Sequence, residues 1–254
     1  MKEGALIAGR YQLTTLIGAG GEAQVFRARD GGGEGEVAIR LLGHAQAFPE
    51  RPQLPEFHPG WVKWLGEGQD ADHGAYQVFE LLSGQTLSRK LQLGPLDPMD
   101  WREFVRQSWD AVEALHRAGW VHGDLHADNF FELEETSSWK LLELPFLRPS
   151  VPLERSALFG SIHTLAPEQL NGAPADVAAD LFALGCLYYR AAAGEYPHPG
   201  TTRQEIAISR LCFAPVPLQE KAPWVSPPWA DWVMDLLAKE RECRFRPHPR
   251  HVDC

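Results

Sequence analysis

The spacing of the apolar residues changes near residue 96, and this change constrains the fold more than any other feature of the chain. Between residues 10 and 90, short runs rich in β-branched and aromatic residues alternate with glycine-containing turns, which is typical of strands. The predicted strands are YQLTTLIG, AQVFRAR, EVAIRLL, WVKWLG and AYQVFELL. Because short turns join antiparallel neighbours, the first third of the chain is predicted to form a small antiparallel sheet.

After residue 96, the apolar spacing becomes that of an α-helix. One apolar stripe runs along the first predicted helix and consists of Trp101, Phe104, Val105, Trp109, Val112 and Leu115. Asp97 is suited to cap the start of this helix, Pro98 to occupy its first turn and Gly119 to end it. Two more helices are predicted, one that ends at Gly194 and one that starts with Ser226 as its cap. A β-rich lobe is therefore predicted to precede an α-rich lobe.

The composition limits the cellular context and the classes of partner. The 254 residues are 44% hydrophobic and 23% charged, which suffices for a core in one large domain or two small lobes. No apolar run approaches the roughly 18 residues of a membrane span, and the N-terminus lacks a signal-peptide pattern. The formal net charge of −10 argues against non-specific nucleic-acid binding, although a nucleotide needs only a local positive site. We therefore expect a cytoplasmic protein with no membrane segment in this chain and no nucleic-acid partner.

The cysteines and the end of the chain carry two further expectations. The cysteines show no CxxC spacing, so neither a zinc site nor a disulfide framework is indicated, and reduced thiols are expected. The chain stops abruptly at RPHPRHVDC, which suggests an excised domain or a missing last helix.

Three glycines lie between the first two predicted strands, at Gly18, Gly20 and Gly21 in IGAGGEAQVF. Without side chains in the way, backbone N–H groups at such positions approach an anion closely. The same pattern also fits an ordinary hairpin, and Ala23 takes the third glycine position of a G-x-G-x-x-G motif. Both interpretations stay open on this segment alone.

Six segments follow one another in an order that is more informative than any one of them. They are VAIR (37–40), VFELLSGQTL (78–87), HGDLHADN (122–129), LLELPF (141–146), LAPEQL (165–170) and DLFALGC (180–186). In this order and at these spacings they resemble the signature motifs of protein kinases, in the style of the bacterial Ser/Thr kinases. The resemblance implies an α+β, two-lobed protein kinase fold in a single domain. Its expected parts are an N-lobe at about 8–82, a hinge at about 82–86 and a C-lobe at about 87–254.

By this resemblance, one group of residues is expected to bind the nucleotide. The glycine loop would cover the phosphates, and the hinge backbone would face the adenine, with Phe79 at the gatekeeper position. Val25 and Ala38 would lie above the adenine ring, and Phe131 would lie below it. The whole group consists of Gly18, Gly20, Gly21, Val25, Ala38, Arg40, Phe79, Glu80, Leu82 and Phe131.

The resemblance also implies catalytic and metal-binding roles. Asp124 corresponds to the catalytic base, and Asn129 corresponds to a magnesium ligand. Glu143 is the second candidate ligand for Mg²⁺, because it stands where the family has the aspartate of DFG. His126 occupies the position of a lysine that touches the transferring phosphate.

Four further residues are expected to be structural, namely His122, Glu168, Asp180 and Arg244. By the resemblance, Asp180 would support the catalytic loop, and Glu168 would pair with Arg244 or with Arg246. Ser161 keeps the usual hydroxyl in an activation segment, 143–168, whose surface would either dock a protein or simply pack the lobe.

Two departures from the family pattern concern the lysine of the VAIK motif and the helix that normally supplies its partner. Arg40 replaces the lysine of VAIK, and its guanidinium is broader and more rigid than an ammonium group. The proline-containing stretch 41–57 leaves the following helix short or missing. Only Glu50 and Glu56 remain there as partners for the arginine.

Two more departures concern the metal and the transferring phosphate. DFG reads Glu143-Leu144-Pro145, and the longer glutamate side chain displaces the carboxylate in a site where Mg²⁺ demands near-ideal geometry. His126 replaces a lysine, and an unperturbed histidine, with a pKa of about 6.5, is mostly neutral at pH 7.

Together the departures favour a pseudokinase, a catalytically impaired domain that acts as a protein-binding or regulatory scaffold. Weak or absent ATP and Mg²⁺ binding and one or more protein partners are expected on this interpretation. The alternative is an atypical active Ser/Thr protein kinase that transfers the γ-phosphate of ATP with Asp124 and Asn129. A second alternative is a small-molecule phosphotransferase, because HGDLHxxN also resembles the loop of aminoglycoside and choline kinases.

Overall fold

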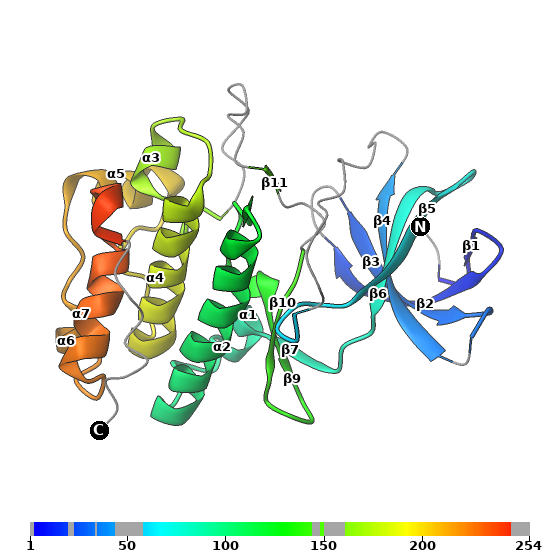
Figure 1. Cartoon of the computed structure of the whole chain (residues 1–254), viewed down its shortest axis with the longest axis horizontal. Helices are drawn as coiled ribbons and strands as arrows, with labels where there is room; N and C mark the ends of the chain where they lie inside the picture. The colour runs from blue at the N-terminus through cyan, green and yellow to red at the C-terminus, as the bar shows by residue number, and fades with distance from the viewer. Residues whose placement is uncertain are drawn as a thin grey trace.

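A six-stranded antiparallel sheet forms the N-terminal part of the protein (Figure 1). The computed structural model describes residues 3–19, 23–33, 35–43, 58–143, 148–149 and 161–244. The strand order is β1-β2-β3-β4-β6-β5. The strands are β1 (Leu6–Ile7), β2 (Tyr11–Ala19), β3 (Gln24–Asp30), β4 (Gly35–Gly43), β5 (Trp64–Asp70) and β6 (Gly74–Glu80). Each of the five predicted strands overlaps an observed strand, but the fourth, predicted at 61–66, lies at Trp64–Asp70, and the short β1 was not predicted.

The alternation of side chains along these strands divides them between two faces of the sheet. One face builds a core within the sheet region, made of Ile7, Tyr11, Leu13, Phe26, Ala28, Val37, Ile39, Leu41, Tyr76 and Val78. On the other face, Val25, Ala38 and Phe79 pack with the core of the helical part. Three residues predicted to surround an adenine ring therefore share the face that is turned to the helices.

Helices are the predominant regular secondary structure after residue 87 (Figure 1). The α-helices are α1 (Leu87–Lys90), α2 (Pro98–Arg117), α3 (Pro167–Leu170), α4 (Val177–Ala193), α5 (Arg203–Cys212), α6 (Leu218–Lys221) and α7 (Pro227–Leu236). Two 3-10 helices span Ala127–Asn129 and Arg241–Arg244. Helix α4 is buried on nearly all sides and contacts both α2 and α7, so it forms the centre of the helical core.

The predicted helix ends are confirmed. The side chain of Asp97 accepts hydrogen bonds from two backbone N–H groups in the first turn of α2, at 2.9 and 3.0 Å. Gly119 follows α2 with φ +80°, and Gly194 ends α4 with φ +79°. Both values lie in the left-handed region, which glycine adopts without steric cost. Ser226 precedes α7 at the N-cap position as predicted, but its side chain makes no capping hydrogen bond there.

Small sheets connect the large sheet to the helices. Strands β7 (Gly84–Thr86), β9 (Phe130–Leu133) and β10 (Trp139–Leu141) form a sheet in the order β10-β9-β7. Strands β8 (Trp120–Val121) and β11 (Arg148–Pro149) form a second sheet. Gly84 approaches β9 so closely that a Cβ there would lie 1.9 Å from the carbonyl oxygen of Glu132. This close pairing places the segment that leaves the large sheet beside the strand that follows residues 122–129.

These observations confirm the predicted α+β architecture of a β-rich part followed by a helical part. The prediction that the helix after β4 is short or missing falls on residues 44–57, which lie outside the described residues together with Glu50 and Glu56. Among the helices that the structure describes, none combines the length and the apolar character that crossing a membrane requires.

One buried histidine makes the stability of this fold dependent on pH. His198 is 3% exposed and stacks on Phe182 of α4, with ring centroids 6.1 Å apart. Burial, together with the positive charges of Arg210 and Lys239, lowers its pKa from 6.5 to about 3. Below about pH 6.5, His198 is therefore protonated in the unfolded chain, whereas in the folded protein it stays neutral down to about pH 3. Stability is accordingly full above pH 6.5 and falls as the pH decreases through this window.

We expect His198→Phe to flatten this pH dependence, because phenylalanine keeps the ring contact and does not titrate. Between pH 6.5 and 4.5 the wild-type protein should lose about 2 to 3 kcal/mol more unfolding free energy than the variant, at about 1.4 kcal/mol for each pH unit. Urea unfolding followed by circular dichroism across this range measures the difference. Parallel pH curves for the two proteins would contradict the assignment.

Candidate active site

The polar segment 122–129 is anchored by Asp180, which lies on α4 and is 1% exposed. Its carboxylate accepts hydrogen bonds from the backbone N–H groups of His122 and Gly123, both at 2.8 Å. A ring nitrogen of His116 lies 2.9 Å from the same carboxylate. Because a buried carboxylate needs these donors, it fixes the segment to the most buried helix of the fold.

Asn129 ties the segment to itself and to the strand beside it. Its side chain is buried, and its Nδ2 donates a hydrogen bond to the backbone oxygen of Asp124 at 2.7 Å. The backbone oxygen of Asn129 accepts from the N–H of Leu142 at 2.8 Å. These bonds bring Asp124, Asn129 and the residue before Glu143 into one bonded group.

The carboxylate of Asp124 keeps the capacity to accept a hydrogen bond. Its side chain is 43% exposed. One of its oxygens, Oδ1, is buried and has no hydrogen-bond partner among the described residues. Because 43% of the side chain is exposed, the carboxylate as a whole remains open to a donor from another molecule. A hydroxyl group is a donor of the right size.

His126 lies between two carboxylates. Its Nε2 is 3.9 Å from Oδ2 of Asp124, and its Nδ1 is 3.7 Å from the carboxylate of Asp128. The same Nδ1 accepts a hydrogen bond from the backbone N–H of Asp128 at 3.2 Å. The histidine side chain therefore lies next to the carboxylate of Asp124.

Arg40 and Glu143 face each other between the sheet and the helical part. Arg40 lies on β4 with its side chain 13% exposed, and its guanidinium is 3.6 Å from the carboxylate of Glu143. Glu143 follows β10 and has φ +61°, in the left-handed region that non-glycine residues rarely adopt. Strained residues of this kind gather at functional sites. The pair thus places one positive and one negative charge near the polar segment 122–129.

The predicted nucleotide-binding residues of the sheet occupy adjacent strands. Gly18 pairs with Val25 between β2 and β3, and Ala38 pairs with Phe79 between β4 and β6. Ala38 and Phe79 are buried, and Val25 is partly buried against the same core. Gly20 and Gly21 lie outside the described residues, so the glycine loop is described only at its two ends.

The predicted hinge residues include one side chain with a different task. Glu80 accepts hydrogen bonds from the N–H of Lys63 at 2.7 Å and from Nζ of Lys140 at 3.1 Å. It thereby connects β6 of the large sheet to β10 of the small one. Leu82 is partly buried against the helical core. Phe131 is also partly buried and lies on β9, in register with Thr86 of β7.

Glu168 and Arg244 form a buried ion pair in the helical part. The guanidinium of Arg244 donates to both oxygens of Glu168, at 2.7 and 3.0 Å, and Arg244 is fully buried. Arg246, the other candidate for this pairing, lies outside the described residues. The pair fixes α3 to the end of the helical core.

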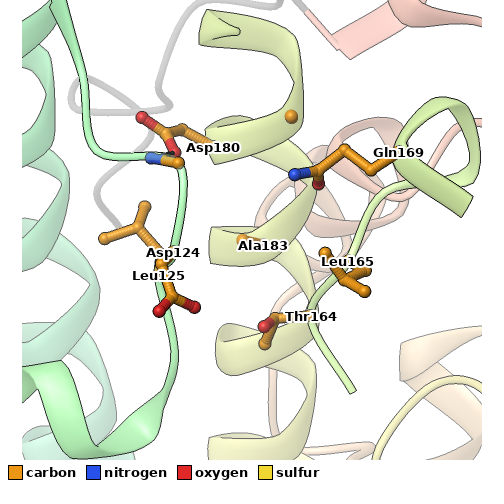
Figure 2. Close-up of a pocket in the computed structure, with 9 residues that line it drawn as sticks. Asp124, Leu125, Thr164, Leu165, Gln169, Asp180 and Ala183 are labelled. Atoms are coloured by element: carbon orange, nitrogen blue, oxygen red, sulfur yellow. Dashed lines mark hydrogen bonds between the residues drawn. The ribbon is translucent and has the colours of Figure 1, made fainter. Parts of the chain in front are cut away.

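A small cavity lies between the catalytic segment, α4 and the residues before α3 (Figure 2). Thr164 and Leu165 line it on one side, and Asp124 and Leu125 line it on the other. Sequence reasoning missed Thr164 and Leu165 as neighbours of Asp124. No local pattern could have found them, because 40 residues separate Thr164 from Asp124 in the chain.

The sequence of this chain is similar to those of known proteins over nearly its whole length. The family profile described as "Protein kinase domain" matches residues 11–248. The DNA damage-responsive serine/threonine-protein kinase RqkA of Deinococcus radiodurans is 34% identical over 95% of this chain and 38% of its own length. The serine/threonine-protein kinase pkn2 of Myxococcus xanthus is 28% identical, over 97% and 32% respectively. The serine/threonine-protein kinase PknA of Mycobacterium tuberculosis is 28% identical, over 96% and 60%. The chain therefore covers less than two thirds of the length of each of these relatives.

These comparisons overturn the prediction of a catalytically impaired scaffold. The relatives that match nearly the whole chain are named as serine/threonine-protein kinases, which favours the alternative of an active enzyme. The physical reason lies in the pairing of two substitutions that the sequence shows separately. Arg40 and Glu143 depart from the family motifs, yet they retain opposite charges and lie 3.6 Å apart.

Proposed function

Because this chain belongs to the protein kinase domain family, we propose that it is an ATP-dependent serine/threonine protein kinase. The observation that carries the proposal is the bonded group that runs from Asp124 through Asn129 to Leu142, with Glu143 next in the chain and paired to Arg40. This group brings a partly exposed carboxylate, an amide and a charged pair together in one place. Its partners are proposed to be protein acceptors, and its location the cytoplasm, which supplies ATP.

Asp124 is proposed to act as the catalytic base. In the reaction, the acceptor hydroxyl oxygen bonds to the γ-phosphorus of ATP, and its proton passes to the carboxylate of Asp124. The bond between the γ-phosphorus and the bridging oxygen breaks, and ADP leaves with that oxygen. Asn129 holds the backbone of Asp124 by a 2.7 Å hydrogen bond, which restricts where the carboxylate points.

Asn129 and Glu143 fit the ligand preference of Mg²⁺, since both supply side-chain oxygens. The Nδ2 of Asn129 is engaged with Asp124, which leaves its Oδ1 for a metal. No group of three or more histidine, cysteine, aspartate or glutamate side chains in the described part of the chain is arranged to hold a metal. That suits Mg²⁺, which usually binds one or two protein side chains together with phosphates. The chemistry it supplies when bound is neutralisation of phosphate charge.

Arg40 is proposed to hold the phosphates of ATP. It carries a positive charge at every physiological pH, and its guanidinium offers several N–H donors to phosphate oxygens. Its side chain is only 13% exposed, so water screens this charge less than it screens a surface charge. Glu143, whose carboxylate lies 3.6 Å from the guanidinium, orients it by its negative charge.

Phosphate transfer in vitro tests the function. The protein is incubated with ATP labelled at the γ-phosphate, Mg²⁺ and a generic protein acceptor, and labelled amino acids are then identified. We expect label on serine or threonine, in the acceptor or in the protein itself, and we expect EDTA to abolish it. Absence of label in both proteins, with ATP and Mg²⁺ in excess, would overturn the proposal.

The same assay tests Arg40. We expect Arg40→Met to raise KM for ATP roughly 10- to 100-fold, because a charge-assisted hydrogen bond contributes about 1.5 to 3 kcal/mol. The matched control is Arg10→Met, which removes an exposed arginine that pairs with Asp30. The control should leave KM for ATP unchanged. Equal KM values in the wild type and the Arg40 variant would exclude a phosphate contact.

A further inference from the structure

A second fully buried arginine lies in the helical part and faces the residues before α3. Arg210 is on α5 and has no exposed surface. Its guanidinium donates to the backbone oxygens of Ile162 at 2.7 Å and of His163 at 2.8 Å. It also donates to the backbone oxygen of Leu165. One side chain thus binds three of the four carbonyl groups in residues 162–165.

Arg210 is buried as a charged group without a carboxylate partner among the described residues, which is energetically unfavourable. No carboxylate among the described residues lies within 4.0 Å of Arg210, in contrast to Arg244, which pairs with Glu168. Both guanidinium groups lie over the ring of Phe182, at 5.3 and 5.0 Å. Burial lowers the pKa of Arg210. Since burying a charge without a counter-ion is expensive, the three carbonyl groups are the contacts that hold it there.

The carbonyl groups belong to a segment that faces the catalytic carboxylate. Thr164 and Leu165 line the cavity on the side opposite Asp124 (Figure 2). The ring of His163 points elsewhere and stacks on Tyr196, with centroids 4.4 Å apart. Residues 161–165 are therefore held by Arg210 through their carbonyl groups, while Thr164 and Leu165 line the same cavity as Asp124. We refer to residues 161–165 as the shelf.

We propose that Arg210 is a positioning residue that fixes the shelf at the distance from Asp124 that a polypeptide acceptor requires. The inference rests on the proposed kinase function, because the shelf matters only if an acceptor hydroxyl is brought to Asp124. Among the described residues, the hydrogen bonds of Arg210 reach neither the nucleotide-binding face of the sheet nor the residues proposed to hold Mg²⁺. Its loss should therefore affect the protein acceptor and leave ATP binding unchanged.

The test compares steady-state kinetics of Arg210→Met with the wild type, using ATP and the protein acceptor as separately varied substrates. We expect kcat/KM for the acceptor to fall roughly 10- to 100-fold, since a displacement of about 1 Å in an active site costs up to about 10²-fold. KM for ATP should stay within experimental error. Arg210→Lys keeps the charge but has one compact donor group, so we expect an intermediate loss. It also serves if the methionine variant does not fold.

The matched control is Lys239→Met, which removes an exposed cation that binds one carbonyl of α5, that of Leu211, at 3.0 Å. It should leave both substrates unaffected. Amide exchange gives a readout that does not need activity: the N–H groups of Thr164 and Leu165, both bonded to the oxygen of Ser161, should exchange at least tenfold faster in the Arg210 variants.

The outcomes separate the two proposals. An active wild type with unchanged acceptor kinetics in both Arg210 variants would overturn the positioning role. So would an equal loss toward ATP and acceptor, because that indicates general damage. An inactive wild type would overturn the kinase function itself, whatever the amide exchange of the shelf.

Discussion

Replacing Asp124 by asparagine is expected to lower kcat for phosphate transfer by roughly 10²- to 10⁴-fold, the range that general-base catalysis contributes. Asparagine has nearly the same shape but cannot accept the proton that leaves the acceptor hydroxyl. Asn129 bonds to the backbone oxygen of residue 124 and not to its side chain, so the loop should keep its conformation. The melting temperature should stay close to that of the wild type, because the carboxylate is 43% exposed.

The matched control is Asp128→Asn, in the same loop. Its side chain is 64% exposed and lies 3.7 Å from the opposite nitrogen of His126. Both variants remove one negative charge beside the same histidine, so a loss caused by that charge alone would appear in both. We expect kcat close to the wild type for Asp128→Asn. A kcat of Asp124→Asn within a few-fold of the wild type would show that another group accepts the proton.

The elements of this fold were predictable wherever the sequence carries a local signal. The stripe from Trp101 to Leu115 defined α2, and Asp97 and Gly119 marked its ends, because caps and periodicity act within a few residues. In the same way, the order of the sequence motifs identified the family. Asp124 and Asn129 were identified as candidates because HGDLHADN (122–129) resembles the catalytic-loop motif of the family.

Long-range contacts of single side chains were not predictable in the same way. Arg210 reads in the sequence as an ordinary polar residue of an amphipathic helix, and it is fully buried. Its partners lie 45 to 48 residues earlier in the chain. The bond between Glu80 and Lys140 spans 60 residues. Neither contact leaves a periodic pattern, so only the folded structure brings these residues together.

The expectation of lost catalysis, which the kinase names of the relatives contradict, rested on motif positions compared one at a time. Arg40 and Glu143 were each compared with a family residue at the same position, and each looked like a loss. In the structure they face each other, so a broader cation is combined with a longer acid. Two substitutions that look damaging one at a time are coupled when their side chains meet. The same caution applies to any inactive-kinase assignment based on single motif positions.

Removal of Glu168 should have the largest effect on stability. Glu168→Gln leaves the charge of Arg244 fully buried without its carboxylate, and breaking a buried ion pair in this way costs about 3 to 5 kcal/mol. At roughly 2 to 4 °C for each kcal/mol in a chain of this size, the melting temperature should fall by roughly 6 to 20 °C. Thermal unfolding followed by circular dichroism measures the change.

The neighbouring pair of Arg241 and Asp176 provides the control, because Arg241 is 46% exposed. Arg241→Met should cost less than about 1 kcal/mol, as expected for an exposed ion pair. A double variant, Glu168→Gln with Arg244→Met, should be less destabilised than the sum of its single variants, because it no longer buries an unpaired charge. Strict additivity would mean that the charges do not interact.

Since Glu168 lies three residues after Leu165, Arg244 fixes the far end of the segment that Arg210 holds at its start. Loss of the ion pair should therefore lower kcat/KM for the protein acceptor as well, at temperatures where the variant is still folded.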